Sequence, residues 1–238
     1  MKFSVLNFML SIIILTMAVS SASAQCPPLY IFTGQAGDRA SAAQPGHPVD
    51  VNNDGYDDIL VRLVSNDSAG MDAGMVRVYS GMDGSLLHTF LGEAAGDLFG
   101  VSVAGAGDVN NDGFGDIIVG AQLNDAGGTN AGRAYVYSGL DGSLIWTFTG
   151  EAAGDTLGHS VSGAGDVNGD GFDDLIVGAW SNDIGGNGAG RAYVFSGKTG
   201  AALYTYTGTG DEHLGIRVSG AGDVNKDGFD DFLIGAWK

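Results

Sequence analysis

The stretch DVNNDGFGD at residues 108–116 is one of four copies of the phrase Asp-x-Asn-x-Asp-Gly-x-x-Asp, which begin at Asp50, Asp108, Asp166 and Asp223. Positions one, three, five and nine carry side-chain oxygens, and position six is glycine. Ca²⁺ is bound by loops of this kind, in which alternate side chains point inward, glycine makes the sharp turn and position seven lends its carbonyl. Each copy therefore predicts a calcium site.

Two other interpretations compete with the metal site. Asp, Asn and Gly are common turn residues, so a single copy would equally indicate an ordinary tight turn. An EF-hand needs a Glu at position twelve and flanking helices. Position twelve here is Val61, Val119, Val177 or Ile234, and each lies in a short apolar run typical of a buried strand. Four copies that keep every acid, the Asn and the Gly favour calcium.

The predicted ligands are the side chains at positions one, three, five and nine and the backbone carbonyl at position seven. About four Ca²⁺ ions are expected. Copy by copy, the residues are Asp50, Asn52, Asp54, Tyr56 and Asp58; Asp108, Asn110, Asp112, Phe114 and Asp116; Asp166, Asn168, Asp170, Phe172 and Asp174; and Asp223, Asn225, Asp227, Phe229 and Asp231. The extra acids at position eight, Asp57, Asp173 and Asp230, are assigned to solvent or to a neighbouring backbone.

Repetition extends beyond the loops. The loops begin 58, 58 and 57 residues apart, and the similarity runs through the whole period. Within the second period, strands are expected at 100–106, 116–122, 133–138 and 144–149, and an Asp-Gly hairpin turn joins the last two. Repeated units of four short antiparallel strands, with the smallest residues in the first strand, predict an all-β fold: a β-propeller of four-stranded antiparallel blades.

The N-terminal 24 residues are predicted to be a signal peptide. Lys2 supplies the positive end, an apolar stretch follows, and Ala22-Ser23-Ala24 forms a small-residue cleavage site. The apolar stretch is shorter than the roughly 20 residues of a membrane span. We therefore expect cleavage after Ala24 and a secreted chain, 25–238, with no membrane span. Its single cysteine, Cys26, has no partner for an internal disulfide.

The repeats are expected to leave the propeller incomplete or open. Blades are predicted at about 39–91, 97–149 and 155–208, with a partial blade at 211–238 and a stray strand at 29–34. These pieces lack one strand of a fourth complete blade. A fragment of a longer protein, an open arc and a ring that another copy completes are the three arrangements that this pattern suggests.

The period resembles the FG-GAP repeat of the integrin α-chain propeller and of bacterial secreted relatives. Phe99-Gly100 stands where that family has Phe-Gly, and Gly105-Ala106-Gly107 stands where it has Gly-Ala-Pro, directly before the Asp-rich loop. The resemblance covers nearly all of residues 29–238. It implies a propeller with calcium loops on one face and a role in cell adhesion or partner binding.

Charge and repetition restrict the function. A formal net charge of −18 disfavours nucleic acid and anionic membranes as partners. The preferred hypothesis is a secreted, non-enzymatic calcium-binding module that binds a protein or glycan on the cell surface or matrix. The alternative is the propeller part of a secreted hydrolase or lyase that acts on polysaccharide. Catalytic residues should break the repeat, and departures such as Glu212 and His213 are few. Arg133 and Arg191 recur with the blades, which predicts ion pairs between blades.

Overall fold

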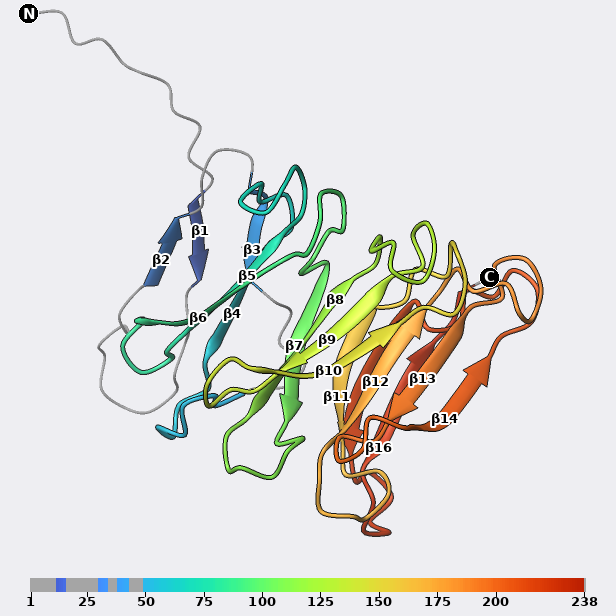
Figure 1. Ribbon diagram of the computed structural model, residues 1–238. Coiled ribbons are helices and arrows are strands. Elements are labelled where there is room, and N and C mark those ends of the chain that lie inside the picture. Colours follow the sequence, from blue (N-terminus) through green and yellow to red (C-terminus); the bar gives the residue numbers. More distant parts are fainter. Residues whose placement is uncertain (1–11, 16–29, 34–37, 43–48, 238) are drawn as a thin grey trace, which may run out of the picture.

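The computed structural model describes residues 12–15, 30–33, 38–42 and 49–237, and this part of the chain consists of strands and their connections, without a helix (Figure 1). From residue 40 onward, three four-stranded antiparallel sheets and one two-stranded sheet follow one another. Their strands are β3 (Ala40–Ala42), β4 (Ile59–Leu63), β5 (Met75–Tyr79) and β6 (Leu86–Leu91); β7 (Ser102–Gly107), β8 (Asp116–Ala121), β9 (Arg133–Tyr137) and β10 (Leu144–Thr149); β11 (Ser160–Gly165), β12 (Asp174–Ala179), β13 (Arg191–Phe195) and β14 (Ala202–Thr207); and β15 (Arg217–Gly222) and β16 (Asp231–Gly235).

Each four-stranded sheet is a meander in which neighbours along the chain are neighbours in the sheet. Short connections allow this arrangement, because antiparallel strands need only a turn between them. The apolar run DIIVGA becomes β8, in which every residue is buried. It pairs with β7 on one side and with β9 on the other, for example through Ile117 and Tyr137.

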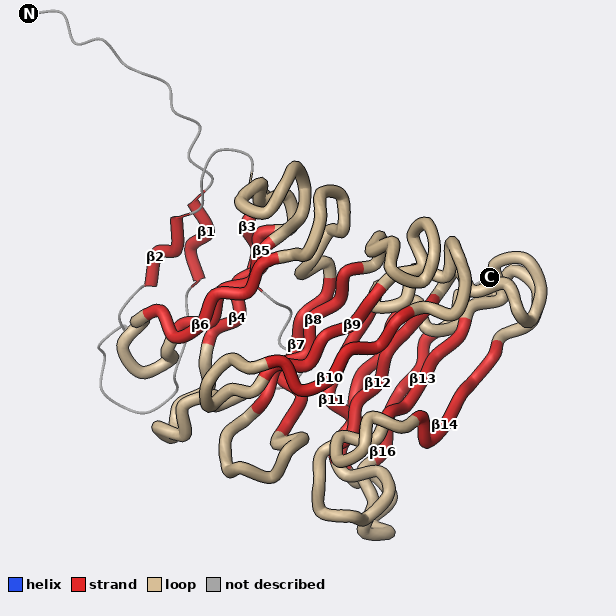
Figure 2. Tube along the Cα trace, in the orientation of Figure 1, coloured by secondary structure: helices blue, strands red, loops and turns tan. Residues whose placement is uncertain are grey.

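The sheets stack through their first strands. β7 and β15 both contact β11, and β4 contacts β7. The small residues of these strands allow a close approach: a Cβ on Gly120 would lie 1.9 Å from the carbonyl oxygen of Gly158 in the next sheet. The described sheets fan out from this line as an open arc (Figure 2). The fold is therefore an incomplete β-propeller of four-stranded blades, as the repeat predicts.

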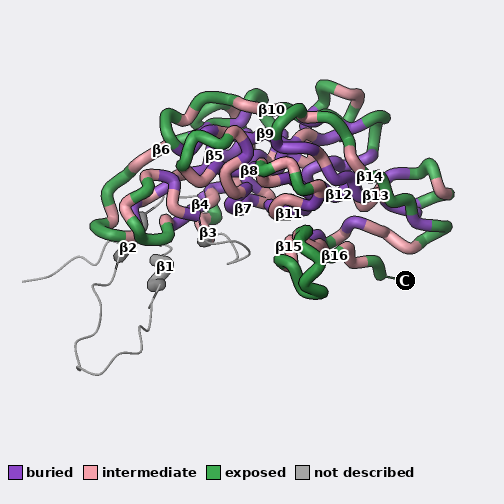
Figure 3. The backbone as a smooth tube through the Cα atoms, turned by 90° about the horizontal axis from the view of Figure 1, so that it is seen from below, coloured by how far each residue is buried: buried purple, intermediate pink, exposed green. Residues whose placement is uncertain are grey.

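Apolar side chains fill the spaces between neighbouring sheets. Phe99, Ile117 and Tyr135 belong to the cluster between the first and second sheets. Ile118, Leu157 and Leu175 belong to the cluster between the second and third. Figure 3 shows burial concentrated around β8, β9, β12 and β13, whereas β15 and β16 are more exposed. Each blade is thus stabilised mainly by the blade next to it.

Two strand positions differ from the expectation. β7 begins at Ser102 rather than at residue 100, because Leu98 and Gly100 have φ angles of 53° and 87° and form a turn. In the first sheet, the innermost strand is β3, where Ser41 pairs with Arg62. Residues 43–48, which replace the small-residue strand in the repeat pattern, lie outside the described residues.

Near the N-terminus, β2 (Tyr30–Thr33) pairs antiparallel with β1 (Ile12–Leu15). β2 matches the predicted stray strand, whereas β1 lies within the predicted signal peptide, whose other residues lie outside the described part. Across the described ranges, no helix has the length and apolar character that crossing a membrane requires.

Candidate metal centres

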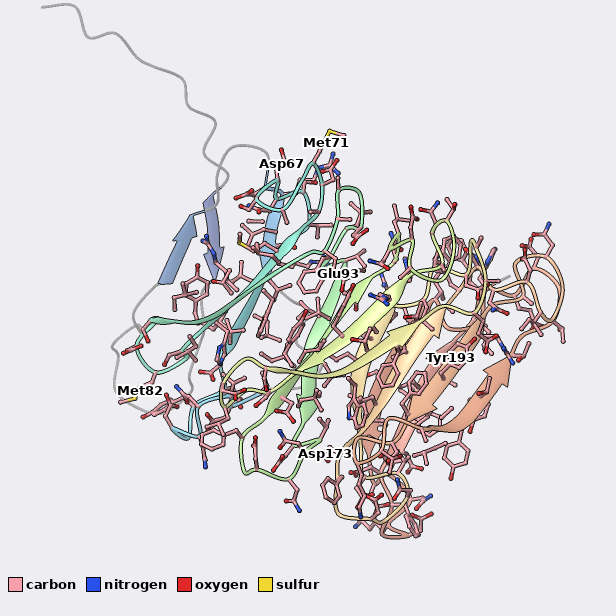
Figure 4. All side chains as sticks on the ribbon, in the orientation of Figure 1. Asp67, Met71, Met82, Glu93, Asp173 and Tyr193 are labelled. Atoms are coloured by element: carbon pink, nitrogen blue, oxygen red, sulfur yellow. The ribbon has the colours of Figure 1, made fainter. Side chains whose placement is uncertain are left out.

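The four Asp-rich loops lie on the same side of the molecule, at one end of the strands. Each connects the first strand of a sheet to the second, as residues 108–115 connect β7 to β8. Asp173, in the third loop, lies at this end, whereas Asp67 and Met71 of the loop after β4 lie at the opposite end (Figure 4). The repeat thus brings all four predicted sites to the same side of the molecule.

Two left-handed residues curl each loop. In the second loop, Asn111 and Gly113 have φ angles of 58° and 90°. A Cβ added to Gly113 would meet no atom within 4 Å, so the backbone angle rather than crowding requires glycine. The corresponding residues of the other copies also have positive φ. The loop therefore folds back on itself and turns its first, third and fifth side chains inward.

Backbone N–H groups hold the inward oxygens. In the second loop, the N–H of Asp112 donates to Oδ1 of Asp108 at 3.0 Å and to Oδ1 of Asn110 at 2.9 Å. Gly113 donates to Oδ2 of Asp108 at 2.8 Å, and Phe114 donates to Oδ1 of Asp112 at 2.9 Å. The first and fourth loops repeat this pattern. A shared donor places oxygens of positions one and three side by side.

The third loop differs in one contact. Asn168 donates to Oδ2 of Asp174 at 3.0 Å, whereas its counterpart Asn110 donates to Oδ2 of Asp112 at 2.9 Å. The third loop has Gly169 at position four, where the second has Asn111. The N–H of Gly169 also donates to Asp166.

The aspartate at position nine, buried in the second and third loops and half-buried in the first and fourth, fixes the loop to the sheet. Asp116 is fully buried, and it accepts bonds from the N–H of Val109 at 2.9 Å and of Gly139 at 3.0 Å. Gly139 begins the hairpin after β9, so one carboxylate joins the loop to the hairpin. Asp58 and Asp174 make the same pair of contacts.

Burial and like charge act together on these carboxyls. Burial raises the pKa of Asp116 to about 7, and repulsion from Asp112 and Asp108 adds to the increase against the two backbone hydrogen bonds. Asp174 has its pKa raised to about 6 by burial, with further repulsion from Asp170 and Asp166. The carboxylates at one, five and nine are thus close enough to repel one another, and a cation between them would relieve this repulsion.

The donor set suits calcium, although the side chains of the described residues form no ready cage. It consists of carboxylate, amide and carbonyl oxygens, which are the ligands that Ca²⁺ prefers. No group of three or more His, Cys, Asp or Glu side chains among these residues is placed to hold a metal ion. The loop oxygens instead accept bonds from their own backbone. Calcium binding therefore stays a prediction for these twenty residues.

The acids at position eight contact the preceding loop. Asp173 accepts a bond from the N–H of Asp108, and Asp230 accepts one from the N–H of Asp166. Asp57, in the first loop, is exposed. The sequence suggested solvent or a neighbouring backbone for all three acids, without indicating which acid does which. Which acids reach the preceding loop depends on how the sheets stack, and the sequence pattern does not show this.

The recurring arginines form the predicted ion pairs between blades. Nη1 of Arg133 lies 2.9 Å from Glu93, which follows β6 of the preceding sheet. Nη1 of Arg191 lies 2.6 Å from Glu151, which follows β10. These pairs lie at the end opposite the Asp-rich loops.

Comparison with known proteins identifies the repeat. A family model for the FG-GAP repeat matches residues 99–137 and 157–195. Integrin alpha-5 of Xenopus laevis is 30% identical over an alignment of 182 residues that covers 69% of this chain and 17% of the integrin. Integrin alpha-6 of Gallus gallus is 33% identical over an alignment of 162 residues that covers 64% of this chain and 15% of that integrin. The chain thus spans about a sixth of the length of these relatives.

Solved structures share the fold at low sequence identity. A rhamnogalacturonan lyase of Bacillus licheniformis superposes with a TM-score of 0.52 at 16% identity, over 98% of this chain and 45% of the lyase. The rhamnogalacturonan lyase YesW gives the same TM-score and identity over 95% of this chain and 44% of that one. The family match covers the residues that carry the second and third loops and the inner strands beside them. The chain therefore carries FG-GAP repeats and is similar to the integrin alpha chains.

Proposed function

We propose that this protein is an extracellular calcium-binding propeller module that acts in adhesion by binding a protein or glycan partner, without catalysis. The observation that carries the proposal is that the same oxygen-rich loop recurs at one end of consecutive blades. Catalysis needs one site rather than four copies, whereas repeated cations would stabilise an extended binding scaffold. The similarity to integrin alpha chains supports a role in adhesion.

In each loop, Ca²⁺ would be held by the oxygens of positions one, three, five and nine and by the carbonyl of position seven. The bound ion would supply positive charge among mutually repelling carboxylates. This chain's own residues would set the geometry: Gly113 and its counterparts turn the loop, and Asp116 and its counterparts anchor it to the hairpin. Secretion would place the loops where the Ca²⁺ concentration suits sites with dissociation constants of about 10⁻⁴ to 10⁻³ M.

Calorimetric titration tests the calcium sites. Protein freed of metal with a chelator should take up about four Ca²⁺ ions. The variant Asp112→Asn should lose one of them, and Asp57→Asn, which changes an acid outside the predicted ligand set, should lose none. A titration without heat, repeated at two temperatures to avoid an accidental zero of the binding enthalpy, would overturn the proposal.

A polysaccharide-acting enzyme is the second candidate, because Glu212 and His213 depart from the repeat. Nε2 of His213 lies 3.1 Å from Asp211, and Glu212 accepts a bond from the N–H of Thr209 at 2.8 Å. Both side chains lie at the end opposite the Asp-rich loops. A screen for cleavage of acidic and neutral polysaccharides distinguishes the candidates. Robust turnover that Glu212→Gln abolishes would establish the enzyme and contradict the non-enzymatic proposal.

A further inference from the structure

At the end opposite the Asp-rich loops, several side chains beside the innermost strands break the repeat. The repeat position that follows the second strand of each sheet holds Val64, Gln122, Trp180 and Trp237 in turn, and Ala236 lies between β16 and Trp237. His159 stands where the neighbouring repeats have valine and isoleucine. Residues that serve the repeated fold should recur with it, so residues that differ at one place are candidates for a single binding site.

Two histidines and two tryptophans at this end of the molecule form a continuous row. The ring centroids of His159 and Trp180 are 5.4 Å apart, those of Trp180 and His213 are 5.1 Å apart, and those of His213 and Trp237 are 6.1 Å apart. We call these four residues the aromatic row. It runs from the third sheet to the last one and is partly exposed, with Trp237 62% exposed. Nδ1 of His159 also pairs with Oε1 of Gln122, which extends the polar edge of the row to the second sheet.

Two arginines on the inner strand pairs also replace small residues of the repeat, and Arg217 pairs with Gly235, two residues before Trp237. Arg217 occupies the position of Ser102 and Ser160, whose hydroxyls accept bonds from N–H groups of the following sheet. Arg62 occupies the position of Gly120 in the first sheet. Its guanidinium donates to the hydroxyl of Ser41 and to the carbonyl of Val101, so it is held in place.

These arginines and His159 form a basic group. Burial lowers the pKa of Arg62 and of His159, and in both cases the charge of Arg217 lowers it further. Arg217 is thus within electrostatic reach of both Arg62 and His159. The chain has only ten Lys and Arg residues against 28 Asp and Glu, so positive charge at one place is a departure from the rest of the molecule. Acidic side chains nearby are Asp211, which pairs with His213, and Glu212.

The combination of flat rings and arginine suits one class of ligand. Arginine presents a rigid fork of N–H donors that binds a carboxylate through two hydrogen bonds. Trp and His rings offer apolar faces with polar edges, and ligand sites commonly combine aromatic side chains with a few placed polar groups. A sugar ring with a carboxylate has matching parts: an apolar face of C–H groups, hydroxyls at its edge and one negative charge.

We propose that the aromatic row, together with Arg217 and Arg62, binds an acidic saccharide. The uronic acid carboxylate pairs with the exposed Arg217, Arg62 adds positive charge, and the sugar rings pack against Trp180 and Trp237. An acidic peptide fits less well, because extended peptides bind chiefly through backbone hydrogen bonds to a strand edge, and the row lies at the ends of strands. The inference rests on the glycan-binding form of the proposed function and names its ligand class and site.

Binding of a galacturonic acid oligomer, followed by calorimetry, tests the proposal. The fully methyl-esterified oligomer serves as a matched control because it keeps the sugar rings and loses the charge. Free Ca²⁺ must be buffered at one concentration, since galacturonate carboxylates bind Ca²⁺ themselves. The acidic oligomer should bind, and the ester should bind at least about tenfold more weakly, which corresponds to the loss of one strong charged contact.

The repeat itself supplies variants that are compatible with the fold. Arg217→Ser and Trp180→Gln introduce the residues found at the same positions of the neighbouring blade, and each should weaken binding about tenfold or more. Arg133→Met introduces the residue of the first blade at an arginine whose side chain pairs with Glu93 and is not part of the aromatic row, and it should leave binding unchanged. Melting curves of all three variants are the control for correct folding.

Four outcomes would overturn the proposal: no binding of the acidic oligomer, equal binding of its methyl ester, unchanged binding by Arg217→Ser, and equally tight binding of polyglutamate. Calcium titration of the unaltered protein separates this inference from the calcium proposal. In that protein, uptake of about four Ca²⁺ ions without saccharide binding would reject the saccharide site alone. Loss of calcium uptake in the unaltered protein would reject the calcium sites instead.

Discussion

The side-chain carboxylate of Asp173 accepts a hydrogen bond of 2.7 Å from the backbone N–H of Asp108, the first residue of the preceding loop. The N–H of Asp173 in turn donates to the carbonyl of Asp108 at 3.3 Å. Asp230 and Asp166 are related in the same way, at 3.0 and 3.1 Å. Consecutive loops are therefore joined directly, in addition to the contacts between their sheets.

The first prediction follows from this pair of bonds. Asp173→Ala should lower the free energy of unfolding by about 1 kcal/mol, because the N–H of Asp108 loses its acceptor. We expect a modest loss because the charged form of Asp173 is itself disfavoured. Burial raises its pKa, and repulsion from Asp230, Asp108 and Asp166 adds to the increase. Urea denaturation in chelator measures the change without any contribution from calcium.

Asp57→Ala is the matched control for that experiment. Asp57 has the same position in the first loop but is exposed, so its removal should change stability by less than about 0.5 kcal/mol. Equal effects of the two substitutions would show that the contact between loops contributes nothing. The sequence treats the two acids alike, and the difference between them comes from the stacking of the sheets.

The second prediction concerns the charge of a loop. Asp112→Asn keeps an oxygen at position five but removes one of three repelling carboxylates. In chelator, this variant loses the oxygen that accepts from Asn110 as well as the repulsion, so its stability should stay close to that of the unaltered protein. In Ca²⁺, it should be less stable because it loses one bound ion. With a dissociation constant of about 10⁻⁴ M, ~1 mM Ca²⁺ would contribute roughly 1.4 kcal/mol per site.

Thermal unfolding with and without Ca²⁺ measures this difference. The isosteric change matters, because Oδ1 of Asp112 accepts a bond from Phe114 and an alanine would lose that bond under both conditions. If Asp112→Asn destabilised the protein equally in Ca²⁺ and in chelator, the loop would be an ordinary hydrogen-bonded turn.

The sequence predicted most of the fold because the fold is repeated. Strands such as 116–122 and 144–149 recur with a loop of constant pattern, so each copy supports the assignment of the others. The period also located the arginines that pair with Glu93 and Glu151. Where the copies diverge, prediction was weaker: in the first sheet, β3 pairs through Ser41, three residues earlier than the repeat spacing suggests.

The contacts that the sequence did not show join residues from different repeats. His159, Trp180 and His213 have unrelated positions in their repeats, and no spacing suggested that their rings would meet. They come together because His159 lies directly before β11, and Trp180 lies directly after β12, which pairs with β11. His213 lies before β15, the corresponding strand of the last sheet. The signal that could have found them is their departure from the repeat, which the sequence analysis applied only to Glu212 and His213.

The third prediction concerns the choice of metal. The predicted ligands are oxygens on a flexible loop, which suits Ca²⁺, whereas Mg²⁺ is smaller, requires near-octahedral geometry and loses water reluctantly. Ca²⁺ should therefore raise the melting temperature much more than Mg²⁺ at the same concentration. Scanning calorimetry at matched ionic strength makes the comparison. Equal protection by both ions would indicate general screening of negative charge rather than specific sites.

The last prediction concerns the packing of the inner strands. A Cβ on Gly120 would lie 1.9 Å from the carbonyl oxygen of Gly158, so Gly120→Ala must push two sheets apart. Overpacking of this kind costs about 1–3 kcal/mol or more. Gly235 has the same position in the last sheet, but a Cβ there would have its nearest neighbour at 3.4 Å. Gly235→Ala should therefore be neutral, or stabilising by about 0.5 kcal/mol through the unfolded chain. Urea denaturation of both variants checks the contrast, and equal losses would show that close approach of the sheets at Gly120 does not limit the packing of the arc.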